Sequence, residues 1–352
     1  MRRLTVVSVA YSLAPVGPDA VGGSEQILTA MDGALVRAGH RSIVVACAGS
    51  HAAGELRVFP AHDPATPIDD AFQRDRQADI RRILTELSDA VDVIHMHGLD
   101  FHHCLPPPGP PVLATLHLPP AWYPPEALHP TRPDTWLQCV SHSELLEAPA
   151  SRAMLPSIPN GVPTELFGSV HPRRGPAALI LARICPEKGV HLALDAAHAA
   201  RVPLIVAGEV FGYAAHQAYF RDEIVPRLDR LRRYVGPAGF REKRHLLARA
   251  RCLLIPSLCA ETSSLVAMEA AACGTPVIAF RQGALPEVVE DGRTGFIVED
   301  VPGMTAAMAK IGGIDPETCR ATAAARFTVE RMAALQIERY QQLVQIQARN
   351  AA

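Results

Sequence analysis

Residues 4–46 read LTVVSVAYSLAPVGPDAVGGSEQILTAMDGALVRAGHRSIVVA and decide the class of fold. The stretch begins with a β-branched run at 4–10 and ends with a second apolar run at 43–46, each typical of a buried strand. A helix that Gly39 ends is expected between them. Its apolar residues share one face: Ile27, Leu28, Met31, Ala34 and Leu35. Strand, helix and strand in this order predict a βαβ unit in a parallel sheet.

The same alternation continues along the chain, whose 352 residues are about twice the usual length of a domain. Further buried strands are expected at 91–95, 112–116, 136–140, 179–182, 204–207, 253–255 and 277–279. Further helices are expected at about 78–87, 190–200, 215–233, 242–250, 264–273, 285–291 and 329–346. A charged stretch with glycine and proline at 160–176 suits an interdomain linker, so the sequence predicts two α/β domains.

Composition excludes several classes of protein. The 48% hydrophobic and 20% charged residues are typical of a globular protein, and no apolar run approaches the roughly 18 residues of a transmembrane helix. A net charge of −2 argues against a nucleic-acid partner. Eight scattered cysteines without a C-x-x-C pair suit a reducing cytosol. The apolar start at 4–14 is interpreted as a strand and not as a signal peptide, so a cytoplasmic protein is expected.

Charge is unevenly distributed between the two halves. Residues 1–150 hold ten arginines, no lysine and 17 acidic residues, whereas the remainder holds 24 basic and 19 acidic residues. The second half therefore suits an anionic ligand, although solvated helix surfaces explain the pattern equally well. The basic run from Arg227 to Arg249, which includes Lys243, is assigned to such a solvated face. Peripheral membrane contact is its rival and is not favoured.

Ten prolines between Pro106 and Pro130 exclude a long helix or a central strand there, so an irregular loop is expected. The loop either shapes a ligand pocket with His117, Trp122 and Tyr123 or only connects elements at the surface, and the sequence leaves both readings open.

The neighbouring histidines do not suit a single metal site. His95 and His97 alternate across a strand and His102 and His103 point apart, so no zinc site is expected. His97 is assigned to the lining of an acceptor cleft and His95 to packing.

Two cations follow the strand expected at 179–182. Arg183 ends that strand and Lys188 opens the next helix, at the edge of a parallel sheet where ligands gather. An arginine fork, a lysine point charge and a helix N-terminus together suit a diphosphate, with plain surface charge as the alternative. Lys188 is one of only three lysines among 34 basic residues, which favours a specific role for its ammonium group.

Two carboxylates flank the start of the helix expected at 264–273. Thr262 or Ser263 is expected to cap this helix, which would leave the amides near Ser264 and Leu265 available to an anion or a hydroxyl. Glu261 precedes the helix. Glu269 lies within it among alanine, methionine and valine, where a carboxylate requires a partner or a polar ligand. A partly exposed glutamate is the plain alternative.

These motifs, taken in order, carry a family resemblance. Arg183-x4-Lys188 followed by Glu261-x7-Glu269 resembles the retaining, nucleotide-sugar-dependent glycosyltransferases of family 4, also called glycosyl transferases group 1. Further segments add to it: Gly22-Gly23-Ser24-Glu25, Thr115-Leu116-His117, Pro159-Asn160-Gly161-Val162, Gly283-Ala284-Leu285-Pro286-Glu287 and Asp291-Gly292-x-Thr294-Gly295.

The resemblance covers nearly the whole chain and implies the glycosyltransferase-B fold, an α/β fold of two Rossmann-like, doubly wound parallel-sheet domains facing a central cleft. Residues 1–165 plus 329–352 would form the N-terminal, acceptor-side domain, to which the C-terminal helix returns. Residues 166–328 would form the donor domain.

The resemblance also implies roles for residues of the donor domain. Arg183 and Lys188 would neutralise the donor diphosphate, Glu269 would bind the ribose hydroxyls, and Glu261 would contact hydroxyls of the transferred sugar. Three kinds of backbone contact complete the set: amides of Gly22 and Gly23 to the diphosphate, amides of Ser264 and Leu265 to sugar or phosphate, and the backbone of Val235 and Gly236 to the base. Many relatives have glycine where this chain has Ser264, which leaves the orientation of the donor sugar in doubt.

The implied reaction transfers a sugar from a nucleoside diphosphate to an unidentified hydroxyl acceptor with retention of configuration. Attack would come from the leaving-group face, with a phosphate oxygen helping to accept the proton and His117 positioning the sugar. No Asp-x-Asp metal signature is present, so no metal and no cofactor beyond the donor is expected. A sugar-nucleotide epimerase or hydrolase of the same fold and a non-catalytic sugar-nucleotide-binding protein remain the alternatives.

Overall fold

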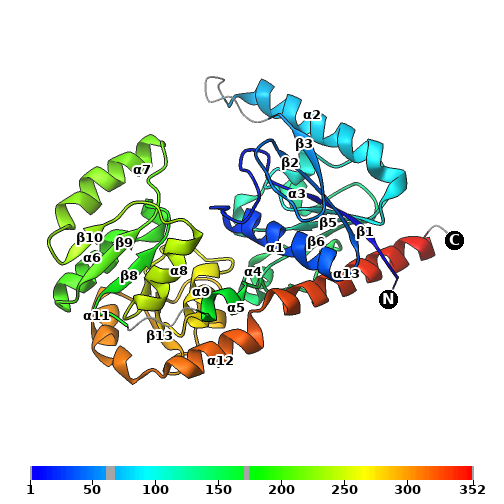
Figure 1. Ribbon diagram of the computed structural model, residues 1–352. Coiled ribbons are helices and arrows are strands. Elements are labelled where there is room, and N and C mark those ends of the chain that lie inside the picture. The colour runs from blue at the N-terminus through cyan, green and yellow to red at the C-terminus, as the bar shows by residue number, and fades with distance from the viewer. Residues whose placement is uncertain (1, 61–67, 170–173, 351–352) are drawn as a thin grey trace. The chain divides into compact units, whose positions relative to one another are not determined.

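The computed structural model describes residues 2–60, 68–169 and 174–350 (Figure 1). The chain divides into two compact units, Met1–Asn160 with Val329–Ala352 and Gly161–Thr328. The sequence analysis placed the boundary at residue 165, and the structure places it slightly earlier, after Asn160. Each unit is an α/β structure built on one parallel sheet, as the two strand–helix alternations of the sequence predict.

The sheet of the first unit has seven strands in the order β3-β2-β1-β4-β5-β6-β7, and every neighbouring pair is parallel. Its strands are β1 (Thr5–Val9), β2 (Arg41–Cys47), β3 (Glu55–Phe59), β4 (Val93–Met96), β5 (Val112–Thr115), β6 (Thr135–Gln138) and β7 (Met154–Leu155). The order reverses direction at β1 and β4. Ligands of doubly wound sheets bind at such a switch point.

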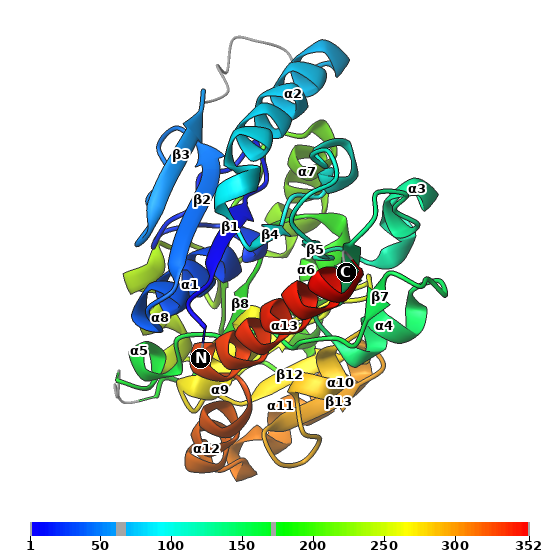
Figure 2. The same cartoon turned by 90° about the vertical axis from the view of Figure 1, so that its right-hand side faces the viewer.

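Helices cover both faces of this sheet. They are α1 (Gly23–Arg37), α2 (Asp70–Leu87), α3 (Pro125–Leu128), α4 (His142–Glu147) and α13 (Val329–Asn350). The last helix, α13, lies beside α1, and α2 lies on the opposite face (Figures 1 and 2). The hydroxyl of Tyr340 on α13 lies 2.6 Å from His95 Nδ1 on β4, so the end of the chain is anchored in the core of the first unit.

The sheet of the second unit has six strands in the order β10-β9-β8-β11-β12-β13, again all parallel. They are β8 (Ala178–Leu181), β9 (Leu204–Ala207), β10 (Arg232–Tyr234), β11 (Leu253–Ile255), β12 (Val277–Phe280) and β13 (Gly295–Val298). The helices are α5 (Thr164–Gly168), α6 (Val190–Ala199), α7 (Ala214–Tyr219), α8 (Phe240–Arg249), α9 (Leu265–Ala272), α10 (Leu285–Val288), α11 (Val301–Lys310) and α12 (Pro316–Arg326). The alanine-rich α9 is buried along most of its length, which lets it pack closely in the core.

The structure departs from the helix predicted at 215–233 and largely confirms the predicted proline-rich loop. The helix expected at 215–233 ends early, because α7 passes into a π-helical turn at Phe220–Ile224 and a 3₁₀ turn at Val225–Arg227 before β10 begins. Pro226 lacks an amide hydrogen and cannot continue the ladder. The proline-rich loop is irregular apart from a 3₁₀ turn, Pro120–Trp122, and α3, each of which starts with proline in its first turn.

All the strands expected from the sequence are present, and the structure adds β3, β7, β10 and β13. Among the described helices, none has the length and the apolar character that crossing a lipid bilayer would require.

Candidate functional site

The turn after β8 places Lys188 beside the loop that precedes α9. Lys188 ends a 3₁₀ turn, Pro186–Lys188, and does not open α6 as expected; Gly189 separates the two with a left-handed φ of 60°. A Cβ on Gly189 would lie 2.1 Å from the carbonyl oxygen of Pro256, so only glycine fits. The amide of Leu258 donates to the carbonyl of Glu187 at 2.8 Å and ties the two loops together.

Lys188 and Glu261 form an ion pair across this junction. Lys188 Nζ lies 2.6 Å from Glu261 Oε1, with side chains 20% and 12% exposed. The Ser257 hydroxyl donates to the same carboxylate oxygen. Gly283 packs against the backbone of Glu261, where a Cβ would lie 2.3 Å from its carbonyl oxygen. Of the four polar side chains that the sequence predicted in this site, the structure therefore brings Lys188 and Glu261 into contact.

Arg183 differs from Lys188 in its surroundings. It is exposed, and it has no ion pair with any residue in the described ranges. In this turn, Glu261 therefore neutralises the Lys188 ammonium, while the exposed Arg183 guanidinium is accessible to an anionic ligand.

Glu269 is the second carboxylate of the predicted site, and its partner is Lys243, which the sequence analysis assigned to a solvated face. Lys243 Nζ on α8 lies 2.5 Å from Glu269 Oε1, and the glutamate is only 3% exposed. Burial raises the pKa of the Glu269 carboxyl, and the Lys243 ammonium acts in the opposite direction. The ammonium also lies 5.4 Å from the ring centre of Phe167, within the range of a cation–π contact.

The assignment of Lys243 to a solvated basic face was therefore wrong. Two signals in the sequence pointed to the pair: lysine is rare in this chain, and Glu269 required a partner within an apolar helix. The pairing itself bridges two helices and could not be read from local spacing.

The N-terminus of α9 lies between the two carboxylates in the sequence. Ser264, and not Thr262 or Ser263 as expected, is its N-cap, with φ −122° and ψ 87°, and the Ser264 side chain makes no capping hydrogen bond. The first amides of a helix have no partner within it, and those of Leu265 and its neighbour need an acceptor. The hydroxyl of Ser263 is buried and also has no partner among the described residues. This end of α9 is suited to a polar or anionic ligand.

Val235 and Gly236 follow β10 on the same sheet. The amide of Val235 donates to the carbonyl of Val206, and the carbonyl of Gly236 accepts from Gly208, both at 2.9 Å. Two of the four backbone amide and carbonyl groups of Val235 and Gly236 are therefore engaged within the protein. The sequence analysis had assigned this backbone to the nucleotide base. The carbonyl of Val235 and the amide of Gly236 are the groups that a base could use.

In the first unit, Gly22 and Gly23 begin α1. Gly22 is the N-cap of this helix and has no side chain to cap it, but the Glu25 carboxylate accepts a hydrogen bond from its own backbone amide in the first turn. A Cβ on Gly22 would lie 1.9 Å from Glu25 Oε2, so the carboxylate occupies the space that a side chain would need. Burial raises the pKa of Glu25, which is 4% exposed. The amides of Gly23 and Ser24 are the groups at the start of α1 that a ligand could use.

His117 follows β5 and contacts a second histidine. His97 Nδ1 and His117 Nε2 lie 3.1 Å apart, so one ring donates to the other. Burial lowers the pKa of His117 to about 4, so this ring is neutral at physiological pH. The hydroxyl of Tyr123 accepts from the amides of His117 at 3.0 Å and Leu118 at 3.3 Å. The proline-rich loop thus fixes the turn at His117, while its Trp122 is 53% exposed.

The geometry expected for the other histidines was wrong. The ring centres of His95 and His97 lie 4.0 Å apart, as do those of His102 and His103. β4 ends at Met96, so His97 lies outside the strand. Side chains of a strand alternate between its two faces, and this alternation no longer keeps the His97 ring away from that of His95. His95 is a packing residue as expected, held between Tyr340 and the hydroxyl of Thr115, which lies 2.7 Å from its Nε2.

The predicted site residues thus divide between the two units. Gly22, Gly23 and His117 belong to the first unit. The second unit holds Arg183, Lys188, Val235, Gly236, Glu261, Ser264, Leu265 and Glu269. Within it, Lys188 contacts Glu261, while Glu269 contacts neither predicted cation.

Comparisons with known proteins place the chain in a family. Residues 21–166 match the model described as Glycosyltransferase Family 4, and residues 175–312 match that of Glycosyl transferases group 1. A glycogen synthase from Mycobacterium tuberculosis is 37% identical over 154 residues, which are 41% of this chain. The aligned stretch spans only 36% of that relative.

Solved structures share the fold over nearly the full chain. A sucrose-phosphate synthase from Thermosynechococcus elongatus aligns with a TM-score of 0.78 at 20% identity, covering 97% of this chain and 99% of that one. The Anabaena protein HepE in complex with UDP and glucose aligns with a TM-score of 0.72 at 18% identity, covering 96% and 100%. The chain has the glycosyltransferase-B fold and belongs to the group 1 glycosyltransferases.

Proposed function

We propose that this protein is a retaining glycosyltransferase that moves a sugar from a nucleoside-diphosphate donor to a hydroxyl acceptor without a bound metal ion. The observation that carries the proposal is the junction of Lys188 and Glu261 beside the N-terminus of α9, where the N-cap Ser264 makes no side-chain capping bond, with Arg183 exposed in the same turn as Lys188. This set offers cations and helix amides for a diphosphate and a carboxylate for sugar hydroxyls.

The proposed chemistry follows from where charge develops. When the bond between the anomeric carbon and the diphosphate breaks, the ring becomes positive and the leaving group becomes more negative. Arg183, Lys188 and the amides of α9 stabilise the leaving group. An arriving diphosphate draws Lys188 from Glu261, which frees the Glu261 carboxylate for the hydroxyls of the sugar.

Glu269 is the proposed partner of the ribose. Its carboxylate is held by the Lys243 ammonium within an apolar helix and offers oxygen atoms that can accept hydrogen bonds from two adjacent hydroxyls. The complex of HepE with UDP and glucose supports a donor of this class by analogy of fold.

His117 is a proposed positioning residue. An imidazole whose pKa is about 4 is a weak base at neutral pH, so removing a proton from the acceptor is poorly matched to this ring. A neutral ring held by His97 can instead exchange hydrogen bonds with a sugar hydroxyl. A phosphate oxygen of the donor is then the proposed proton acceptor on the face from which the diphosphate leaves.

The proposal is tested by incubating the protein with sugar-labelled UDP, GDP, ADP and dTDP donors, each alone and with a panel of saccharide and polyol acceptors. We expect label to enter an acceptor with one donor, and NMR of the product to show the anomeric configuration of the donor. Free labelled sugar or an epimerised donor without an acceptor would instead identify a hydrolase or an epimerase. Tight binding without any turnover would identify a non-catalytic binding protein.

A further inference from the structure

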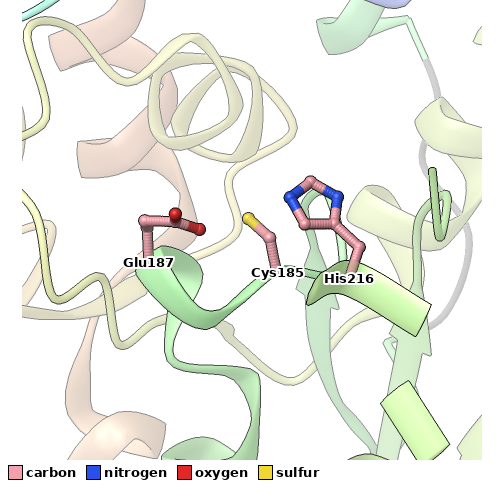
Figure 3. Close-up of side chains that lie close together, drawn as sticks. All are labelled: Cys185, Glu187 and His216. Atoms are coloured by element: carbon pink, nitrogen blue, oxygen red, sulfur yellow. The ribbon is translucent and has the colours of Figure 1, made fainter. Parts of the chain in front are cut away.

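The second unit holds a cluster of metal-ligand side chains that the proposed reaction does not use. Cys185 and Glu187 lie in the turn after β8, and His216 lies on α7 (Figure 3). Their ligand atoms, one sulfur, one carboxylate oxygen and one imidazole nitrogen, all lie within 4.8 Å of one another. Within the described ranges, no other group of three histidine, cysteine or acidic residues is as close.

We propose that Cys185, Glu187 and His216 bind a single zinc ion. Sulfur and nitrogen ligands favour zinc over magnesium or calcium, which prefer oxygen. Bonds of about 2.0–2.3 Å at tetrahedral angles place ligand atoms roughly 3.5 Å apart. The three ligand atoms therefore need to close by at most about 1.3 Å, a distance that small rotations of the three side chains can supply.

The surroundings of the three side chains are compatible with an ion. Cys185 is buried, Glu187 is exposed and His216 is half-buried, so an ion and a water molecule as fourth ligand would approach the cluster from the Glu187 side. The His216 ring packs against Tyr213, with ring centres 5.1 Å apart, and its Nδ1 is buried without a partner among the described residues. No described hydrogen bond thus competes with a metal for this ring.

In the metal-free protein the Cys185 thiol donates to the carbonyl of Arg183, with 3.8 Å between sulfur and oxygen. Binding of zinc replaces the S–H bond by an S–Zn bond and releases that proton to solvent.

A bound ion would tie the turn that carries Lys188 to α7. This inference does not depend on the proposed transferase activity, since it concerns metal binding alone and is measured without donor or acceptor.

The test is a titration of the reduced, metal-free full-length protein with Co²⁺, followed by displacement with Zn²⁺. We expect one Co²⁺ per chain, a near-ultraviolet charge-transfer band from a cobalt–thiolate bond, proton release, and loss of the band when Zn²⁺ is added. Cys185→Ser should abolish the band, and His216→Gln and Glu187→Gln should each weaken binding by about tenfold or more.

Matched controls lie in the same unit. All eight cysteines are free, and Cys259 is partly exposed, so Cys259→Ser should keep the band. The exposed His245 on α8 supplies the control His245→Gln. Because Glu187 is exposed, Glu187→Gln keeps the test valid if Cys185→Ser fails to fold. An absent thiolate band in the wild-type protein, or equal Co²⁺ affinity in the wild type and Glu187→Gln, would overturn the proposal.

Discussion

Replacement of Lys243 by methionine is expected to lower the free energy of unfolding of the second unit by about 3–5 kcal/mol. The substitution keeps the aliphatic stem but leaves the Glu269 carboxylate 3% exposed and without its ammonium partner. A buried charge without a partner is among the costliest defects in a protein core. Urea denaturation followed by far-ultraviolet circular dichroism measures the change.

The chain supplies a matched control because it has only three lysines. Lys310 ends α11 and is exposed, so Lys310→Met should change the free energy of unfolding by less than about 0.5 kcal/mol. In the double variant Lys243→Met/Glu269→Leu the lost stability should largely return, since apolar residues can replace a buried ion pair. An equal, small effect of Lys243→Met and Lys310→Met would show that the pair at Glu269 is not a buried one.

The first unit is expected to lose several kcal/mol of stability between pH 6.5 and pH 4. Burial lowers the pKa of His95 to about 3 and that of His117 to about 4, and it lowers that of His97 well below the usual 6.5. In this pH window the unfolded chain binds protons that the folded unit does not, so stability falls as pH falls. Each such imidazole contributes up to about 1.4 kcal/mol per pH unit. Glu25, whose pKa burial raises, opposes this trend at its lower end.

Intrinsic fluorescence isolates this effect, because both tryptophans of the chain, Trp122 and Trp136, belong to the first unit. Urea denaturation at a series of pH values should give a free energy that falls with acidity. His97→Asn should reduce the slope, and replacement of the exposed His129 by asparagine should leave it unchanged. A free energy independent of pH across this window would contradict the burial of the three imidazoles.

The strands that the sequence missed share one property. β3 and β7 are the two edges of the first sheet, and β10 and β13 are the two edges of the second. Central parallel strands are buried on both faces and appear in the sequence as continuous apolar runs. This is why the nine expected strands could be predicted. β3 and β10 carry charged residues, as in Arg232–Tyr234, and β7 has only two residues. β13 (GFIV) is as apolar and as long as its neighbour β12, so these properties do not explain why it was missed.

In the candidate site, too, local sequence patterns could be predicted, whereas contacts between residues far apart in the chain could not. The turn of Arg183 and Lys188 and the helix of Glu269 follow from local patterns. The contacts of Lys188 with Glu261 and of Lys243 with Glu269 join residues 73 and 26 positions apart. The spacing of residues along the chain was enough to predict these side chains as candidates. Which carboxylate pairs with each lysine depends on how the helices pack on the sheet, and this could not be predicted from the sequence.

The central claim is that Arg183 and Lys188 bind the donor diphosphate, and isothermal calorimetry with the nucleoside diphosphate of the active donor tests it most directly. Lys188→Met and Arg183→Ala should each weaken binding by about 1.5–3 kcal/mol, which is roughly 10- to 100-fold in the dissociation constant. Lys310→Met should bind as the wild type does. Equal dissociation constants for the wild type, Lys188→Met and Arg183→Ala, all folded by circular dichroism, would contradict the account.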